Sequence, residues 1–165
     1  MSRLMGPKLA EVKFNVVLIE PEIPNNTGNI GRTCVGTHSV LHLVGKLGFE
    51  ITDRQLKRAG LDYWQHLEWY HHPTLEEWLK LVKDPSRVFF FSKKASKNYW
   101  NAEFRHGDWL VFGKETKGLD EALLQRHESQ CLRIPYSGPI RSLNQASAVA
   151  VALFEGLRQL DQEPT

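Results

Sequence analysis

The fold is organised around the segment Arg133–Gln145, RIPYSGPIRSLNQ, and the apolar stretch that continues from it to about Leu160. Residues 131–134 read as a short strand leading into a loop with two prolines and one glycine. The loop is predicted to end at a helix, because Ser142 and Gln145 have the spacing of a capping box. Such a loop holds backbone N–H and C=O groups in fixed positions, where they suit a small polar ligand. An ordinary strand-to-helix turn is the simpler explanation of this segment alone. The choice between such a turn and a ligand site therefore depends on the other loops.

Apolar runs elsewhere in the chain are typical of strands buried on both faces. They occupy residues 14–19, 40–44, 67–70, 87–91 and 108–112, with the short run at 131–134 as a sixth. Helices are expected over residues 27–37, 53–59, 74–82, 119–126 and 143–160. Pro21 and Pro24 are expected to bar a helix before Thr27, and Thr74 with Glu77 forms a second capping box. This alternation predicts an α/β fold, with a mainly parallel sheet flanked by helices.

The composition describes an ordinary globular protein. The chain has 165 residues, of which 41% are apolar and 24% charged, and we expect one domain over residues 14–160. Residues 1–13 are expected to form an N-terminal extension without the apolar centre of a signal peptide, and residues 161–165 a tail. No apolar run is long enough to cross a bilayer, so no membrane partner is expected. The net charge of +2 permits a nucleic-acid partner without indicating one.

The signatures of several common enzyme classes are missing from the sequence. It contains no G-x-x-x-x-G-K-[ST] phosphate loop, no G-x-G-x-x-G dinucleotide fingerprint and no G-x-S-x-G elbow. The seven histidines lack the spacing of zinc ligands, so no metal is expected. Cys34 and Cys131 also lack metal or redox spacing, and both are predicted to be buried thiols in a reducing cytoplasm.

Three blocks remain to be explained: residues 26–32 (NTGNIGR), 112–119 (FGKETKGL) and 134–144 (IPYSGPIRSLN). In this order and spacing they resemble the SPOUT methyltransferases, RNA-modifying enzymes with a C-terminal trefoil knot. Residues 20–24 (EPEIP) and 58–63 (RAGLDY) narrow the resemblance to the TrmL-type enzymes. Those enzymes are small tRNA 2'-O-methyltransferases that act at the wobble nucleotide, cytidine or uridine, of leucine tRNAs. The resemblance covers about residues 14–160.

The resemblance implies a SPOUT fold with its knot, S-adenosylmethionine as methyl donor, a homodimer, and the tRNA anticodon stem-loop as substrate. By position, it places the cofactor contacts at Phe91, Gly113, Glu115, Gly118, Ile134, Ser142 and Leu143. These residue types suit the task, because apolar Phe91 and Ile134 can enclose adenine and Gly113 lets backbone approach a ligand. Plain core packing would explain the two apolar residues equally well.

The same resemblance makes Arg32 the catalytic residue. A guanidinium stays protonated and is a poor general base, so we expect Arg32 to hold an RNA phosphate and orient the ribose. Whether it also acts as a base through that phosphate stays open, and a surface arginine on the first helix is the plain alternative. Glu115 is a second candidate for proton handling, although acceptance of backbone amides in its own turn is favoured.

RNA contacts are expected from side chains that are cationic, aromatic or amide-bearing. They are Asn29, Arg58, Tyr63, Arg141 and Asn144. Two alternatives to RNA contact stay open. Tyr63 and Trp64 can be half-buried core residues, and the two asparagines can fix the conformation of loops. The last helix is apolar nearly all round, which indicates burial on more than one side, against its sheet and against a second subunit. A wholly internal helix explains that pattern nearly as well.

Two other functions compete with wobble methylation. One is a knotted 2'-O-methyltransferase with another tRNA or rRNA target. The other is a non-catalytic module that binds S-adenosylmethionine or RNA. Arg32, Glu115 and Ser142 are all present, which favours an enzyme.

Overall fold

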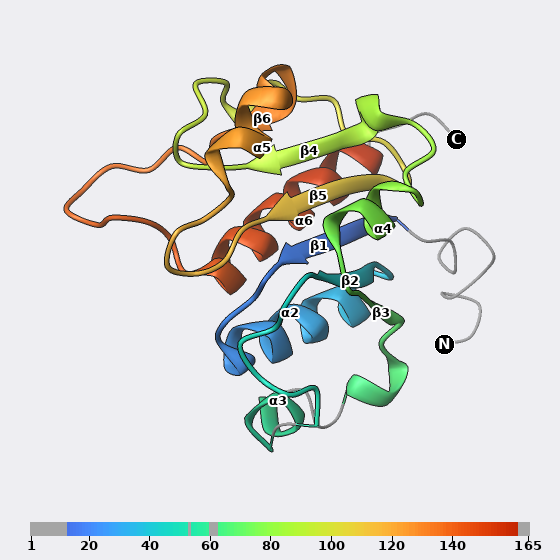
Figure 1. Ribbon diagram of the computed structural model, residues 1–165. Coiled ribbons are helices and arrows are strands. Elements are labelled where there is room, and N and C mark those ends of the chain that lie inside the picture. Colours follow the sequence, from blue (N-terminus) through green and yellow to red (C-terminus); the bar gives the residue numbers. More distant parts are fainter. Residues whose placement is uncertain (1–12, 53, 60–62, 162–165) are drawn as a thin grey trace.

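The computed structural model describes residues 13–52, 54–59 and 63–161 of the chain. Within these residues one sheet of six parallel strands has the order β3-β2-β1-β5-β4-β6 (Figure 1). The strands are β1 Phe14–Ile19, β2 Val40–Val44, β3 Trp69–His72, β4 Val88–Phe91, β5 Asp108–Phe112 and β6 Cys131–Leu132. The mainly parallel sheet that the apolar runs predict is confirmed.

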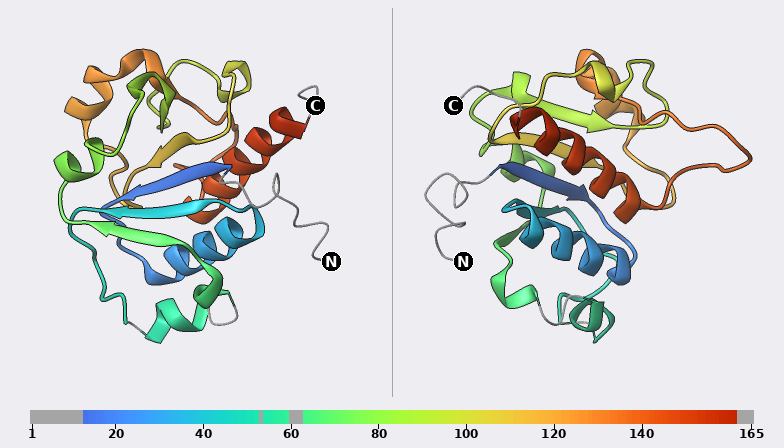
Figure 2. Two further views of the ribbon diagram at one scale, coloured as in Figure 1. Left: turned by 90° about the vertical axis from the view of Figure 1, so that its right-hand side faces the viewer. Right: turned by 180° about the vertical axis from the view of Figure 1, so that it is seen from behind.

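Helices cover both faces of this sheet. They are α2 Pro24–Gly36, α3 Arg54–Ala59, α4 Leu75–Leu79, α5 Glu121–Arg126 and α6 Gln145–Asp161. Short 3₁₀ turns lie at η2 Trp64–His66, η3 Pro85–Arg87, η4 Tyr99–Asn101 and η5 Glu128–Gln130. Helices α2 and α6 lie side by side on one face, and α4 and α5 lie on the other (Figure 2).

Burial follows the alternation of side chains along each strand. In β1, Val16 and Leu18 point into a core that also contains Leu153 of α6. Their neighbour Val17 points into a second core on the opposite face, where Trp78 of α4 is fully buried. Because both faces are covered, the strands read as continuous apolar runs rather than as alternating ones.

Two of the expected helix starts are wrong. Helix α2 begins at Pro24 and not at Thr27, because a proline is tolerated at the first helical position, where its missing N–H has no partner to lose. The cap of α6 is Asn144 and not Ser142: the Ser147 N–H donates to Asn144 Oδ1 at 3.2 Å. The other expected cap is confirmed, since the Glu77 N–H donates to Thr74 Oγ1 at 3.2 Å.

Other boundaries differ by a few residues. Strand β3 begins at Trp69, because Leu67 still ends the preceding turn with an N–H bond to the Trp64 carbonyl. Cys34 and Cys131 are buried and free, as predicted. Residues 1–12 of the expected N-terminal extension, residues 162–165 of the expected tail and positions 60–62 of the 58–63 stretch lie outside the described residues.

No helix among the described residues combines the length and the apolar character that a bilayer-spanning segment needs. In the same part of the chain, His, Cys, Asp and Glu side chains nowhere gather in threes as a metal ion would require.

Candidate active site

A cavity of about 660 Å³ lies at the carboxyl edge of the sheet, where β4 and β5 end and the segment after β6 begins. This edge is where open parallel sheets bind their ligands, and the volume suits a small molecule. All seven positions expected to contact the cofactor line this cavity: Phe91, Gly113, Glu115, Gly118, Ile134, Ser142 and Leu143. Residues far apart in the sequence therefore meet in one place.

The walls of the cavity are chemically divided. Phe91 is 7% exposed and stacks on Phe112 with ring centroids 4.9 Å apart. Ile134 and Leu143 add partly buried apolar surface. The rim carries cations from the two neighbouring loops, namely Lys93, Lys94, Lys114 and Lys117. Such a cavity suits a ligand with a flat apolar ring and a separate polar, anionic end.

Gly113 has a structural role in addition to the expected one. A Cβ at this position would lie 2.2 Å from the Gly118 carbonyl carbon and 2.3 Å from the Leu119 nitrogen. The missing side chain thus lets the 113–119 turn close on itself. Gly118, with φ at 70°, completes this turn by donating its N–H to the Lys114 carbonyl at 2.8 Å.

Glu115 joins this turn to the start of α2. Its carboxylate accepts the Glu22 N–H at 2.9 Å and the Ile23 N–H at 2.7 Å. Acceptance of backbone amides is what the sequence favoured, but the amides belong to the β1–α2 loop and not to the turn of Glu115 itself. The carboxylate also lies beside the N-terminus of α2, the positive end of the helix dipole.

A chain of side-chain amides extends from Glu115 to α6. Asn26 Nδ2 donates to Glu115 Oε2 at 3.3 Å, and Asn144 Nδ2 donates to Asn26 Oδ1 at 3.2 Å. Because the carboxylate only accepts, it fixes the orientation of both amides, and Asn144 Oδ1 is left to cap α6. Asn144 therefore fixes a loop, as one of the alternatives held. Asn26, which the sequence reasoning missed, stands at the first position of the NTGNIGR block.

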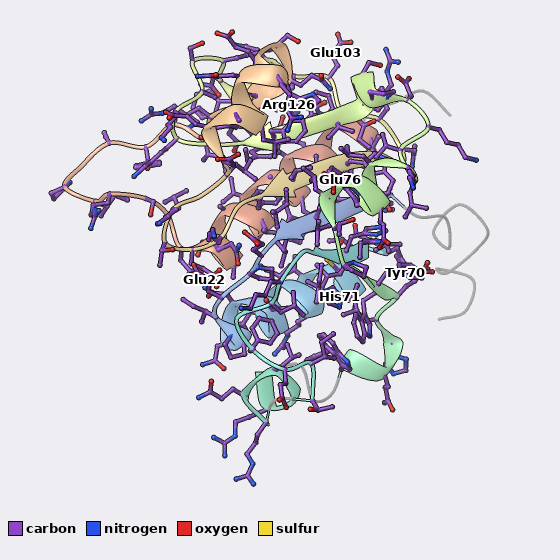
Figure 3. All side chains as sticks on the ribbon, in the orientation of Figure 1. Glu22, Tyr70, His71, Glu76, Glu103 and Arg126 are labelled. Carbon is purple, nitrogen blue, oxygen red and sulfur yellow. The ribbon has the colours of Figure 1, made fainter. Side chains whose placement is uncertain are left out.

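The same two loops are joined a second time in the opposite direction. Glu22 accepts the Thr116 N–H at 3.1 Å and the Thr116 hydroxyl at 2.8 Å, and these bonds lower the pKa of its carboxyl group. Glu22 lies beyond the carboxyl end of β1 (Figure 3). Reciprocal bonds of this kind hold the floor of the cavity in one geometry before any ligand arrives.

Gln145 is a second cavity residue that the sequence reasoning missed. Its Nε2 donates to the Gly113 carbonyl at 2.7 Å, which leaves its buried Oε1 with no partner among the described residues. The amide cannot be turned round, because two carbonyl oxygens would then face each other. A buried acceptor beside a cavity is suited to a ligand N–H or O–H. Its signal lay in the expected capping box, where Gln145 was given only a helix-end role.

Of the expected RNA-contacting residues, only one lines the cavity. Asn144 lines the cavity, whereas Asn29, Arg58 and Arg141 are exposed outside it. Tyr63 is half-buried, and the guanidinium of Arg32 lies over its ring, 4.3 Å from the centroid. Arg32 is exposed on α2 and is not among the described residues that line the cavity.

Fold and cavity together define an α/β protein with a ligand site at the carboxyl edge of a parallel sheet. The chain belongs to the SpoU rRNA Methylase family, whose model matches residues 13–154. The "tRNA (cytidine(34)-2'-O)-methyltransferase" of Burkholderia pseudomallei (strain 1106a) is 44% identical over 148 residues, which are 88% of this chain and 95% of the relative.

Solved structures agree with this assignment. One, described as "Structural insights into the 2-OH methylation of C/U34 on tRNA", is 44% identical with a TM-score of 0.85 and covers 91% of this chain and 97% of its own. The AdoMet-bound rRNA methyltransferase from Sinorhizobium meliloti is 25% identical with a TM-score of 0.80, over 91% of this chain and 57% of that one. The expected family is confirmed.

Proposed function

We propose that the protein transfers a methyl group from S-adenosylmethionine to the ribose 2'-hydroxyl of the wobble nucleotide, cytidine or uridine, in tRNA anticodons. Leucine tRNAs are the proposed substrates and the cytoplasm the proposed compartment. The observation that carries this function is the meeting of all seven expected cofactor positions in one cavity. The similarity to the Burkholderia enzyme and to the C/U34 structure supports the choice of substrate.

The cavity fits S-adenosylmethionine on its own chemistry. Phe91, Ile134 and Leu143 offer apolar surface for adenine, and the unpartnered Gln145 Oε1 offers an acceptor for a ligand donor. The lysines of the rim suit the carboxylate of the methionine part. When bound, this cofactor supplies an electrophilic methyl group. The contribution of the protein is then to hold both substrates in line, which by itself gives large accelerations.

In this function Arg32 binds an RNA phosphate and orients the ribose. Its guanidinium is a fixed cation that matches a phosphate with two parallel N–H donors. Glu115 is already engaged by two backbone amides and the amide of Asn26, so its carboxylate organises the loops and is not the base. Asn29, Arg58 and Arg141 are exposed and remain proposed RNA contacts, as does Asn144 at the cavity.

We further propose that a homodimer completes the site. Arg32 is exposed and does not line the cavity of its own chain, so a second chain is needed to bring a cofactor cavity beside the RNA that Arg32 binds. Helix α6 offers the contact: Val149 and Leu153 are buried against the sheet, while Val151 is 40% and Phe154 58% exposed. Two apolar side chains exposed on one helix are suited to an isologous interface.

We also propose one domain over residues 14–160 and a knotted C-terminal half. The β4–β5 connection passes closely around the segment after β6, and this supports the knot. The Arg133 N–H donates to the Lys97 carbonyl at 2.7 Å, and the Tyr99 N–H donates to the Arg133 carbonyl at 3.0 Å.

Radiolabelled methyl transfer to leucine tRNA transcripts tests the function. Incorporation should follow the wobble nucleotide and vanish when that nucleotide carries a 2'-deoxyribose. Arg32→Ala should abolish transfer while S-adenosylmethionine still binds, and Arg32→Lys should restore little, because an ammonium lacks the paired donors. Cofactor binding without transfer to any of these tRNAs would instead favour another RNA target, and activity of Arg32→Ala would exclude its proposed role.

A further inference from the structure

Trp100 is the most exposed aromatic side chain among the described residues, with 61% of its surface accessible. It lies in η4, within the long connection between β4 and β5. An exposed tryptophan is costly to leave in water and is often found where a partner binds. The aromatics expected to stack on RNA are less available, because Arg32 already lies over Tyr63 and Trp64 packs against Trp69.

The backbone holds Trp100 in a fixed position. Asn98 caps the turn by accepting the Trp100 N–H at 3.0 Å. The preceding residue, Tyr99, is 6% exposed and donates its N–H to the Arg133 carbonyl at 3.0 Å. A backbone that is already fixed lowers the entropy lost when the side chain binds a partner, which suits a stacking platform.

Aromatic rings connect this position to the cavity. The Trp100 and Tyr99 centroids are 6.1 Å apart, and Tyr99 lies 6.4 Å from Phe91, which lines the cavity. Trp100 is therefore one ring removed from the wall of the proposed cofactor site.

Cationic residues lie near Trp100 along the backbone, because the Arg133 N–H donates to the Lys97 carbonyl and the Tyr99 N–H donates to the Arg133 carbonyl. The Lys97 ammonium has no carboxylate partner among the described residues, and that of Lys93 donates only to the Arg141 carbonyl at 3.3 Å. The Arg133 guanidinium likewise donates to a carbonyl, that of Lys93, and keeps its charge. Uncompensated cations beside an exposed aromatic match a polyanion that carries flat bases, and this combination is typical of single-stranded nucleic-acid binding.

We propose that Trp100 stacks an unpaired base of the RNA substrate, with Lys93, Lys97 and Arg133 binding its phosphates. This role rests on the proposed RNA methylation and assigns it a substrate-binding surface beside the cofactor cavity. The surface binds single-stranded RNA rather than a second copy of the chain, because three like charges would oppose the same charges on a partner.

The test compares Trp100→Ala, Trp100→Phe and Lys97→Ala with the wild type on an anticodon stem-loop RNA. Trp100→Ala should raise the RNA Kd and KM about tenfold, since one base stack is lost, and Trp100→Phe should recover part of this. The kcat at saturating RNA, the Kd of S-adenosylmethionine and the Tm should not change. Lys97→Ala should reduce the slope of log Kd against log salt by about 0.7, the contribution of one phosphate.

Tyr70→Ala is the matched control. Tyr70 is 47% exposed on β3, at the opposite edge of the sheet from β6, and its loss should leave RNA binding unchanged. An unchanged RNA Kd in Trp100→Ala, or a weakened dimer in sedimentation, would overturn the stacking role. If the wild type bound the stem-loop through Trp100 but methylated no tRNA, the proposed function would fail and this surface would stand.

Discussion

The guanidinium of Arg32 lies 4.3 Å from the centroid of the Tyr63 ring, between two segments that the sequence separates by 31 residues. Gly31, the neighbour of Arg32, favours close packing in this region, because a Cβ there would lie only 3.0 Å from Leu67 and 3.2 Å from Trp64. The turn that follows Tyr63 can therefore pack directly on α2. The ring holds the cation without neutralising it, and this leaves the charge free for a phosphate.

Tyr63 is accordingly expected to position Arg32. Tyr63→Leu should lower kcat about tenfold at saturating RNA, because the guanidinium loses a contact worth about 0.5–2 kcal/mol. Tyr63→Phe should restore kcat, since the ring face is retained. Steady-state kinetics with both substrates measures this. A rise in RNA KM with unchanged kcat would show instead that Tyr63 contacts RNA directly.

Replacement of Glu115 should affect stability before chemistry. Glu115→Gln exchanges one acceptor oxygen for an amino group that faces backbone donors, so the free energy of unfolding should fall by about 1–3 kcal/mol. Urea denaturation measures this change. The shape of the pH–rate profile should be retained, whereas loss of a kinetic pKa would identify Glu115 as the base.

The amide of Gln145 is expected to serve the cofactor more than the fold. Gln145→Leu removes an unpartnered buried oxygen together with the bond to the Gly113 carbonyl, and these effects should nearly cancel in stability. The Kd of S-adenosylmethionine should rise about three- to tenfold, as expected for one lost hydrogen bond. Calorimetric titration checks this, and an unchanged Kd would mean that Oε1 meets no ligand group.

Acid should destabilise the protein through His42 of β2. Its Nε2 lies 3.0 Å from Asn15 Oδ1 and its Nδ1 lies 3.0 Å from His72 Nε2. Burial, with a smaller contribution from His72, lowers the pKa of His42 from 6.5 to about 3. Asn15 Nδ2 donates to the Gly107 carbonyl, so its Oδ1 accepts from His42 Nε2–H and His42 Nδ1 is left to accept from His72. The folded chain therefore holds this imidazole neutral.

The sign of the pH effect follows from linkage. Below pH 6.5 the unfolded chain binds a proton at His42 that the folded chain does not bind, and this proton favours unfolding. Above pH 6.5 His42 is neutral in both states, so its contribution to the free energy of unfolding is fully present. It should be lost as the pH falls from 6.5 towards about 3, by up to about 1.4 kcal/mol per pH unit. Urea titrations across this range measure the slope. His42→Leu should flatten it, whereas His106→Asn, at an exposed histidine, should not.

The exposed face of α6 is expected to hold the dimer together. Phe154→Glu should give a monomer in sedimentation, because a charge would be buried against a second chain. The monomer should still bind S-adenosylmethionine but lose most methyl transfer. Leu81→Glu is the control, since Leu81 is 49% exposed at a site far from α6 in sequence and should tolerate the charge. A dimeric and active Phe154→Glu protein would remove α6 from the interface.

Local pattern determined much of the fold. The apolar runs predicted the parallel sheet, because strands buried on both faces carry apolar residues at successive positions. Thr74 and Glu77 marked a helix start through contacts three residues apart. Pro24 and Ser142 led to wrong predictions of where α2 and α6 begin, because each residue is compatible with more than one position at a helix start.

The cavity positions came from the family resemblance, and only the tertiary structure decided what each residue does there. The sequence could not show that Glu115 accepts amides of residues 22 and 23, that Gly113 makes room for backbone, or that Arg32 lies on Tyr63. These contacts join segments tens of residues apart, and their partners are chosen by how the helices and loops pack on the sheet. Periodicity and capping act within a few residues, so they specify the elements but not the contacts between distant loops.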